Sequence, residues 1–124
     1  MSLALLFSIY SCNKNKEDNV NIVSHAKDKD VLIWKHDSIG CDKIRTIELG
    51  KRLFDKYLVN IENEDALFNI LGKPNKILYE NDVKHYIFYI NSCCKNNVLL
   101  EECDYSFIVI TIEKNRIKFS SGIN

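Results

Sequence analysis

The side chains with the most evident chemistry are five cysteines in a chain of 124 residues, at positions 12, 41, 93, 94 and 103. A thiol can form a disulfide, bind zinc, act as a nucleophile or carry a lipid, and its surroundings decide between these fates. Cys12 ends an apolar run, whereas the other four lie in polar stretches. We therefore expect Cys12 to have a different role from the rest.

The residues before Cys12 predict an export signal. Residues 1–11 read MSLALLFSIYS, which is apolar but far shorter than the roughly 20 residues that a membrane-spanning helix needs. A short apolar run that ends at small residues is typical of a secretory signal peptide. Ile9 to Cys12 resembles a bacterial lipobox, in which the cysteine receives a diacylglyceryl group and becomes the new N-terminus. We expect residues 1–11 to be a lipoprotein signal peptide and Cys12 to be the lipidation site, with a buried N-terminal strand as the alternative.

The following segment predicts a flexible tether over residues 12–30. Asn, Lys, Asp, Glu and Ser dominate it, and only residues 20–23 form a small apolar patch, which could be a short edge strand. Lys16, Glu17 and Asp18 resemble the signal that sends some Bacteroidota lipoproteins to the cell surface. The predicted location is the cell envelope, with the protein lipid-anchored to the outer membrane and facing either the periplasm or the outside.

Four cysteines remain, and an even number in an oxidising compartment predicts two disulfides. Adjacent residues on a strand point to opposite faces, so Cys93 and Cys94 should have different partners. The preferred arrangement joins Cys94 to Cys103 and Cys93 to Cys41. Pairing of Cys41 with Cys103 or with Cys94 stays open. The competing interpretation, zinc bound by these thiols and a histidine, fits no familiar ligand spacing.

Charge and motifs exclude several classes of function. The chain has 17 basic and 17 acidic residues, so it lacks the positive surplus that nucleic-acid binding requires. It contains no Gly-rich phosphate loop, nucleophile elbow or telling carboxylate pair. Three scattered histidines, at positions 25, 36 and 85, are expected to be surface or packing residues. We expect no catalytic residue, metal or cofactor.

Residues 31–124 predict a single α+β domain that begins with helices. Apolar residues at helical spacing predict a first helix from Asp42 to Leu58, capped by Asp42 or Ser38. Gly50 either weakens this helix or lets another element approach it closely. A second helix should begin at Asn63 and stop before Gly72 and Pro74. Arg45 is expected to form a local structural pair with Asp37.

The C-terminal half predicts antiparallel strands. Residues 76–80 should pair with residues 83–91 around a turn at residues 81–82. A second turn at residues 114–115 places Ile112 opposite Ile117 and Ile110 opposite Phe119, so that one face is apolar. Residues 86–90 are apolar on both faces, which predicts a central strand. The expected fold is α+β, with two N-terminal helices packed on one face of a three- to four-stranded antiparallel meander sheet.

Tyrosines gather in this strand half of the sequence. Alternation could place several of them on one face of the sheet, as a partner-binding surface. The other interpretation is that they form only the second face of a small sheet. The candidates for partner binding are Tyr79, Tyr86, Tyr89 and Tyr105.

Short motifs add a resemblance to known families. A signal, a lipobox and a tether, then helices ending in LGKP and a meander, resemble the small lipoproteins of the outer-membrane β-barrel assembly machinery. This order of helices and strands is also similar to that of the β-lactamase-inhibitor-protein-like fold. WKHDSIGCDKIR at 34–45 and ILGKPNK at 70–76 resemble a group of small Bacteroidota lipoproteins. The resemblance implies two helices on one face of a small antiparallel sheet.

The resemblance also implies binding to proteins rather than catalysis. The expected partners are an envelope protein and, through the lipid anchor, the membrane. An immunity-type protein that neutralises an exported toxin or enzyme is the second interpretation. An envelope enzyme or metal-binding protein is the third.

Overall fold

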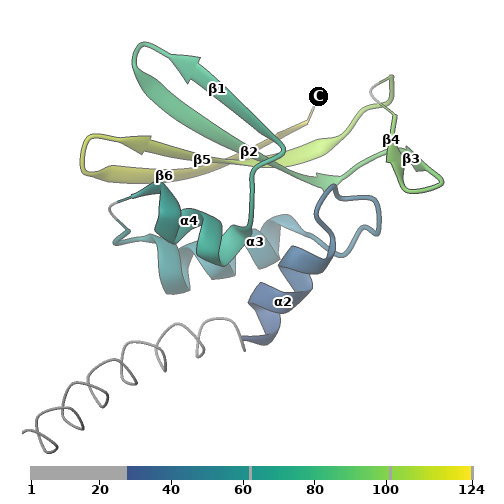
Figure 1. The fold of residues 1–124 in the computed structure, drawn as a ribbon, viewed down its shortest axis with the longest axis horizontal. Helices are drawn as coiled ribbons and strands as arrows, with labels where there is room; N and C mark the ends of the chain where they lie inside the picture. Colours follow the sequence, from purple (N-terminus) through teal and green to yellow (C-terminus); the bar gives the residue numbers. More distant parts are fainter. Residues whose placement is uncertain (1–27, 62, 101, 124) are drawn as a thin grey trace, which may run out of the picture.

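The computed structural model describes residues 28–61, 63–100 and 102–123, which form an α+β domain (Figure 1). A four-stranded antiparallel sheet has the strand order β1-β2-β5-β6, and β3 and β4 form a separate two-stranded sheet. The helices lie on one face of the larger sheet, and no described helix lies on the other face. The elements are α2 Lys29–His36, α3 Ile47–Leu53, π-helical η1 Phe54–Leu58, α4 Glu64–Leu71, β1 Lys76–Glu80, β2 Val83–Asn91, β3 Cys94–Lys95, β4 Val98–Leu99, β5 Ser106–Glu113 and β6 Arg116–Ile123.

The strand predictions are confirmed in position and register. β1 and β2 have the predicted bounds and meet at Asn81 and Asp82, whose φ angles of 51° and 65° suit a two-residue hairpin turn. In the second hairpin Ile112 lies opposite Ile117, as expected from the sorting of apolar residues to one face. β2 lies between β1 and β5, so it is the central strand that its two apolar faces predicted.

The hydrophobic core lies between the helices and the sheet, and the even-numbered residues of β2 and β5 contribute to it. Trp34 of α2 lies edge-on to Phe88 of β2, with ring centroids 6.3 Å apart. A Cβ atom at Gly50 would lie only 3.1 Å from Cδ1 of Ile108 and 3.3 Å from the Trp34 ring. Gly50 therefore allows the close approach that was one of its two predicted roles.

Two helix predictions need correction. Residues 29–36 form a helix, α2, that the sequence did not indicate, and Asp28 caps it, so the folded domain begins before Val31. The helix expected from Asp42 starts only at Ile47, where the side chain of Thr46 accepts from the Leu49 amide. The short helix α4 matches its prediction: Asn63 caps its start, and Gly72 follows its end with a φ of 76°.

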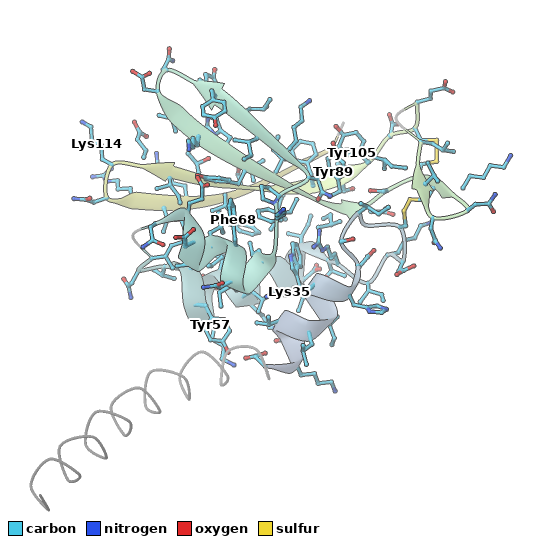
Figure 2. The ribbon with its side chains drawn as sticks, in the orientation of Figure 1. Lys35, Tyr57, Phe68, Tyr89, Tyr105 and Lys114 are labelled. Carbon is cyan, nitrogen blue, oxygen red and sulfur yellow. A yellow bond between two sulfur atoms is a disulfide. The ribbon has the colours of Figure 1, made fainter. Side chains whose placement is uncertain are left out.

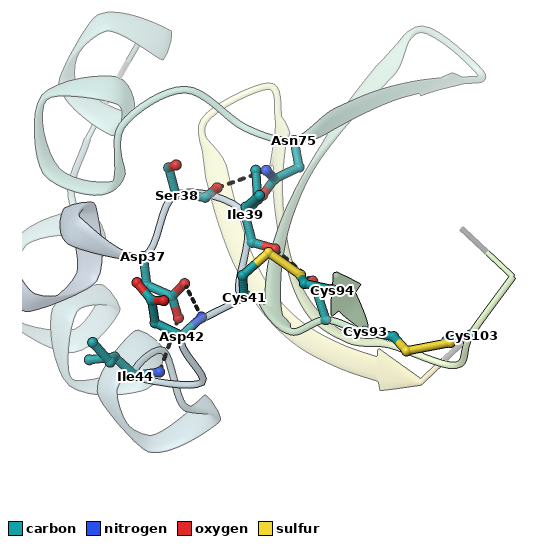
Figure 3. The surroundings of a disulfide bond; sticks show 11 residues. Asp37, Ser38, Ile39, Cys41, Asp42, Ile44, Asn75, Cys93, Cys94 and Cys103 are labelled. Atoms are coloured by element: carbon teal, nitrogen blue, oxygen red, sulfur yellow. Dashed lines mark hydrogen bonds between the residues drawn. A yellow bond between two sulfur atoms is a disulfide. The ribbon is translucent and has the colours of Figure 1, made fainter. Parts of the chain in front are cut away.

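A buried carboxylate explains the late start of α3. Asp37 is only 2 % exposed, and its carboxylate accepts hydrogen bonds from the backbone amides of Asp42 and Ile44, both at 3.0 Å (Figure 3). It also accepts from the backbone amide of Arg45 at 3.2 Å. In an α-helix the backbone N–H groups lie parallel to the helix axis. The three amides that point to the Asp37 carboxylate converge on one group, so these residues cannot be helical. Residues 42–46 therefore form a loop around Asp37.

The guanidinium of Arg45 is buried beside this loop. It donates to the carbonyl oxygens of Trp34, Ser38 and Tyr89 at 2.8, 3.2 and 3.2 Å, and it lies 4.5 Å from the Trp34 ring centroid. Burial lowers the pKa of Arg45 to about 10, and the nearby charge of Asp37 opposes that shift. The predicted link between Arg45 and Asp37 thus exists through the Arg45 backbone amide.

We predict that Asp37→Asn destabilises the domain by about 2–4 kcal/mol, because an amide presents an N–H group where backbone donors converge. Urea unfolding followed by circular dichroism measures the loss. The matched control is Asp42→Asn on the exposed side of the same loop, which should change stability by less than about 0.5 kcal/mol. Equal losses in the two variants would contradict the central role of Asp37.

Candidate protein-binding surface

Three aromatic side chains form a cluster on the sheet face that carries no described helix. Tyr89 of β2 lies directly opposite Phe107 of β5, and Tyr105 immediately precedes β5. The Tyr105 ring centroid is 4.6 Å from that of Tyr89 and 5.9 Å from that of Phe107. Figure 2 shows Tyr89 and Tyr105 side by side, away from the helices. We call these three residues the aromatic cluster.

Apolar residues extend the aromatic cluster along the sheet. Ile87 of β2 lies opposite Val109 of β5 and is only 7 % exposed, although it does not belong to the core under the helices. At Gly122 of β6 an added Cβ would lie 2.7 Å from Cζ of Phe107, so the ring lies across the strand backbone. This face therefore has an apolar centre that runs from β2 over β5 to β6.

Polar side chains border this centre. On the same face, Nδ1 of His85 lies 2.8 Å from the Thr111 hydroxyl, and its Nε2 lies 3.6 Å from a carboxylate oxygen of Glu80. Lys118 of β6 lies opposite Thr111. An aromatic centre with a polar rim is the usual composition of a protein–protein interface.

The structure divides the four tyrosines that the sequence singled out. Tyr89 and Tyr105 come together, but Tyr86 is 2 % exposed under the helices, where its hydroxyl donates to Glu64 at 2.6 Å. The prediction that Tyr86 contributes to a binding surface is therefore wrong. Tyr79 is 69 % exposed, but it lies on the edge strand β1 opposite Lys84, on the side of the sheet that bears Tyr86.

Sequence reasoning missed Ile87, Phe107 and Val109 as members of this surface. A signal for two of them was present, because the even-numbered residues of β5 were assigned to the core and strand alternation sends Phe107 and Val109 to the opposite face. Only the pairing of β2 with β5 shows that they lie beside Ile87 and Tyr89.

Two disulfides join the four remaining cysteines (Figure 3). Cys41 is bonded to Cys94 and Cys93 to Cys103, with Cα–Cα distances of 5.6 and 5.7 Å. The preferred prediction, Cys94 with Cys103 and Cys93 with Cys41, is wrong. The Cys41–Cys94 pairing that the sequence left open is the one observed.

Hydrogen bonds at the end of β2 explain this connectivity. Phe88 and Ile90 face the helices, and Ser92 continues the series: its amide donates to Gly40 at 3.0 Å and its hydroxyl to Ile39 at 2.6 Å. These bonds hold Gly40 beside Ser92, so that the next residue, Cys41, lies within bonding distance of Cys94.

The disulfides also support the small β3–β4 hairpin. Its strands have two residues each, which is too short for stability in water without other support. Asn96 and Asn97 form its turn with φ angles of 54° and 61°. The hairpin exposes apolar side chains, with Val98 61 % and Leu100 38 % exposed. It is a second apolar feature, at the end of the molecule that carries the disulfides (Figure 2).

Other predicted features lie elsewhere. Cys12, His25 and residues 16–18 lie outside the described residues. Among the described residues, no three His, Cys, Asp or Glu side chains are grouped so that they could hold a metal ion. None of the described helices has the length and apolar character needed to cross a bilayer.

Comparisons with known proteins give no relative. No protein-family model matches the chain, and no curated protein or solved structure matches it either.

Two carboxylates at helix N-termini, those of Asp28 and Glu64, have lowered pKa values. The hydrogen bond from Tyr86, followed by that from Lys84, lowers the pKa of Glu64 from its ordinary 4.5. Hydrogen bonds from Lys56 and then Tyr57 lower the pKa of Asp28, the N-cap of α2. Both carboxylates therefore stabilise the fold when they are ionised.

We predict that acid weakens the fold partly through Glu64. Its folded-state pKa lies below its unfolded-state value, so its contribution is complete above about pH 4.5 and is lost as the pH falls through the folded-state pKa. Glu64→Gln should therefore show a smaller loss of unfolding free energy between about pH 5 and pH 2. Tyr86→Phe removes the main hydrogen-bond donor to Glu64, so it should reduce the dependence of the unfolding free energy on pH in the same way. If the unfolding free energy of both variants depended on pH as strongly as that of the unmodified protein, this assignment would be contradicted.

We also predict the cost of removing each disulfide. Cys41→Ala with Cys94→Ala opens a sequence separation of 53 residues and should cost about 4 kcal/mol, whereas Cys93→Ala with Cys103→Ala opens one of 10 and should cost about 3 kcal/mol. Denaturant unfolding under non-reducing conditions measures both. Non-reducing peptide mapping, with fragmentation between Cys93 and Cys94, checks the connectivity. A Cys94–Cys103 peptide would contradict it.

Proposed function

We propose that the protein is a protein-binding module, carried by a lipoprotein of the bacterial cell envelope and anchored through Cys12. The observation that supports binding is the aromatic cluster of Tyr89, Tyr105 and Phe107 on the helix-free face of the sheet. Aromatic side chains at the centre of a surface with a polar rim provide most of the binding energy in many interfaces. The proposed partner is another protein of the envelope.

The disulfides support an extracytoplasmic location. Disulfides persist in oxidising compartments and are rare in the reducing cytosol. Four of the five cysteines are bonded in pairs, and Cys12 is the one left for lipid attachment. The lipobox resemblance of residues 9–12 points in the same direction. On this proposal the anchor is in the outer membrane.

The order of helices and strands adds support for the kind of partner. Helices precede an antiparallel sheet, as the resemblance to small lipoproteins of the β-barrel assembly machinery implied, although α2 and the β3–β4 hairpin were not part of that expectation. A role in outer-membrane assembly or maintenance is therefore the specific form of the proposal.

The alternative function is that of an immunity or inhibitor protein against an exported toxin or enzyme. The observation that favours it is the disulfide-supported β3–β4 hairpin, which presents Val98 and Leu100 to solvent. A rigid, exposed apolar element loses little conformational entropy on binding, which suits insertion into a pocket of another protein.

Site-specific photo-crosslinking in the native envelope distinguishes the two functions. A photoreactive residue replaces Thr111 on the rim of the aromatic cluster, Val98 on the hairpin, or Lys35 on the exposed side of α2 as the control (Figure 2). We expect an adduct with an envelope protein at Thr111 and none at Lys35. An adduct only at Val98 would favour the inhibitor function, and equal labelling at all three positions would contradict a defined surface.

We predict that Tyr105→Ala lowers the yield of the Thr111 adduct about tenfold, because loss of an aromatic residue at the centre of an interface costs about 1.4 kcal/mol or more. The matched control is Tyr79→Ala, which removes an equally large but separate ring and should leave the yield unchanged. Quantitative mass spectrometry of the adduct measures both. The reverse result would place the interface on β1.

The anchor has its own test. Intact-mass analysis of protein purified from its own host should find residues 1–11 removed and Cys12 carrying acyl chains. Cys12→Ser should retain residues 1–11 and carry no acyl chain. An unmodified chain with residues 1–11 present would exclude the lipoprotein proposal without affecting the binding surface.

A further inference from the structure

One edge of the sheet is long, regular and without proline. β6, Arg116–Ile123, pairs with β5 along eight continuous residue pairs without a bulge, and none of the described residues pairs with its other edge. Its two charged residues, Arg116 and Lys118, lie in its first half, and its last four residues are Ser, Ser, Gly and Ile, without charge or proline. Ile123 is 80 % exposed, more than any other large apolar side chain described. Long edges without charge, proline or bulges are the ones that pair with another strand.

The opposite edge is better protected. β1 has five residues, bears the charged side chains of Lys76 and Glu80 at its ends, and is preceded by Pro74. Short edge strands with charges at their ends resist pairing with other chains. β6 differs from β1 in its length and in its uncharged second half, so an incoming strand meets the more favourable edge at β6.

We propose that β6 is a homodimer interface, in which it pairs antiparallel with β6 of a second copy around a two-fold axis at Ser120. In this register Ile117 lies opposite Ile123 of the second copy, on the helix side of the sheet. Lys118 lies opposite Gly122 of the second copy, on the other face. The most exposed apolar side chain thereby gains an apolar neighbour, and the lysine gains a neighbour without a side chain.

The direction of the backbone groups agrees with this register. The two-residue turn at residues 114–115 makes Glu113 and Arg116 a hydrogen-bonded pair within the hairpin. Alternate residues of β6 therefore direct their amide and carbonyl groups to the free edge, and these are residues 117, 119, 121 and 123. A two-fold axis at Ser120 places Phe119 opposite Ser121 of the second copy, so that both contribute these free groups.

Charge disfavours the register centred on Lys118, and it favours a second copy as the occupant. An axis at Lys118 would place the two lysines directly opposite each other, which destabilises strand pairing. An axis at Ser120 separates them by roughly 14 Å along and across the strands, beyond a Debye length of about 8 Å. The formal net charge of the chain is zero, so two copies do not repel as a whole.

The expected affinity is modest. One pair of strands buries less than the roughly 1,600 Å² of a standard stable interface, so we expect a dissociation constant on the order of 100 µM. Pairing would join the two four-stranded sheets into one of eight strands. Since the Phe107 ring lies across Gly122, the aromatic clusters of the two copies would share one continuous face. This interface does not depend on the proposed function.

Sedimentation equilibrium of the full chain, from about 10 µM to 1 mM, tests the association. All samples carry Cys12→Ser, so that the one cysteine outside the two bridges forms no intermolecular disulfide. We expect a reversible monomer–dimer equilibrium. A monomer at 1 mM would overturn the proposal.

A matched pair of variants tests the edge. Ser121→Pro removes an amide that points to the free edge, a position at which edge strands tolerate proline, and should weaken the dimer at least tenfold. Ser121→Thr keeps the amide and should dimerise as before. Circular dichroism checks that both variants fold. Equal dimerisation of the two variants would overturn the proposal.

Engineered cysteines test the register independently of the proline variant. Ser120→Cys places two thiols at the axis, at a Cα–Cα distance of about 4.5 Å, which suits a disulfide. Lys118→Cys places them roughly 14 Å apart. Mild oxidation should crosslink the Ser120→Cys protein at least tenfold faster. Faster crosslinking of the Lys118→Cys protein would overturn the axis at Ser120.

Discussion

Three backbone amides donate to the buried carboxylate of Asp37, and the arrangement of helices on the sheet depends on this contact. The carboxylate fixes residues 42–46 as a loop. That loop places Arg45 over the Trp34 ring, from where its guanidinium reaches a carbonyl of β2. Trp34 in turn donates from Nε1 to the Leu71 carbonyl at the end of α4, at 3.1 Å. One polar group thus connects α2, α3, α4 and the central strand, and buried polar groups persist only when they are satisfied in this way.

The same loop leads to the disulfides and to the exposed hairpin. Gly40 has a φ of 74°, and its carbonyl accepts the amide of Ser92, which brings Cys41 beside Cys94. The β3–β4 hairpin is therefore fixed to the helix layer and not only to the end of β2. A small domain with a limited core gains rigidity from such covalent links, at the end of the molecule where the hairpin extends beyond the sheet.

The two faces of the sheet have different roles because the strands alternate. Even-numbered residues of β2 and β5, such as Phe88 and Ile108, fill the core under the helices. Odd-numbered residues of the same strands, such as Tyr89 and Phe107, form the aromatic cluster on the other face. The aromatic residues of this second face are half-buried, and no described helix covers them.

Local rules placed the elements whose signals lie within a few residues of each other. The turns at Asn81 and at Lys114, the cap at Asn63 and the stop at Gly72 could be predicted because each depends on short-range backbone geometry. The start of α3 could not, because it depends on Asp37, which lies outside the predicted helix and is buried only when the helices meet the sheet. The helix α2 was missed because its stabilising partners, Phe88 and the Leu71 carbonyl, are distant in sequence.

The sequence by itself determined the α+β class, both hairpin registers and the alternation of apolar residues, since strand periodicity and turn chemistry are local. Tertiary structure alone decided which cysteine meets Cys41, that Tyr86 is buried while Tyr89 joins Tyr105 and Phe107, and that β6 leaves its edge open among the described residues. These outcomes depend on which strands become neighbours and on which face the helices cover. Both are set by packing between segments that are far apart in the chain.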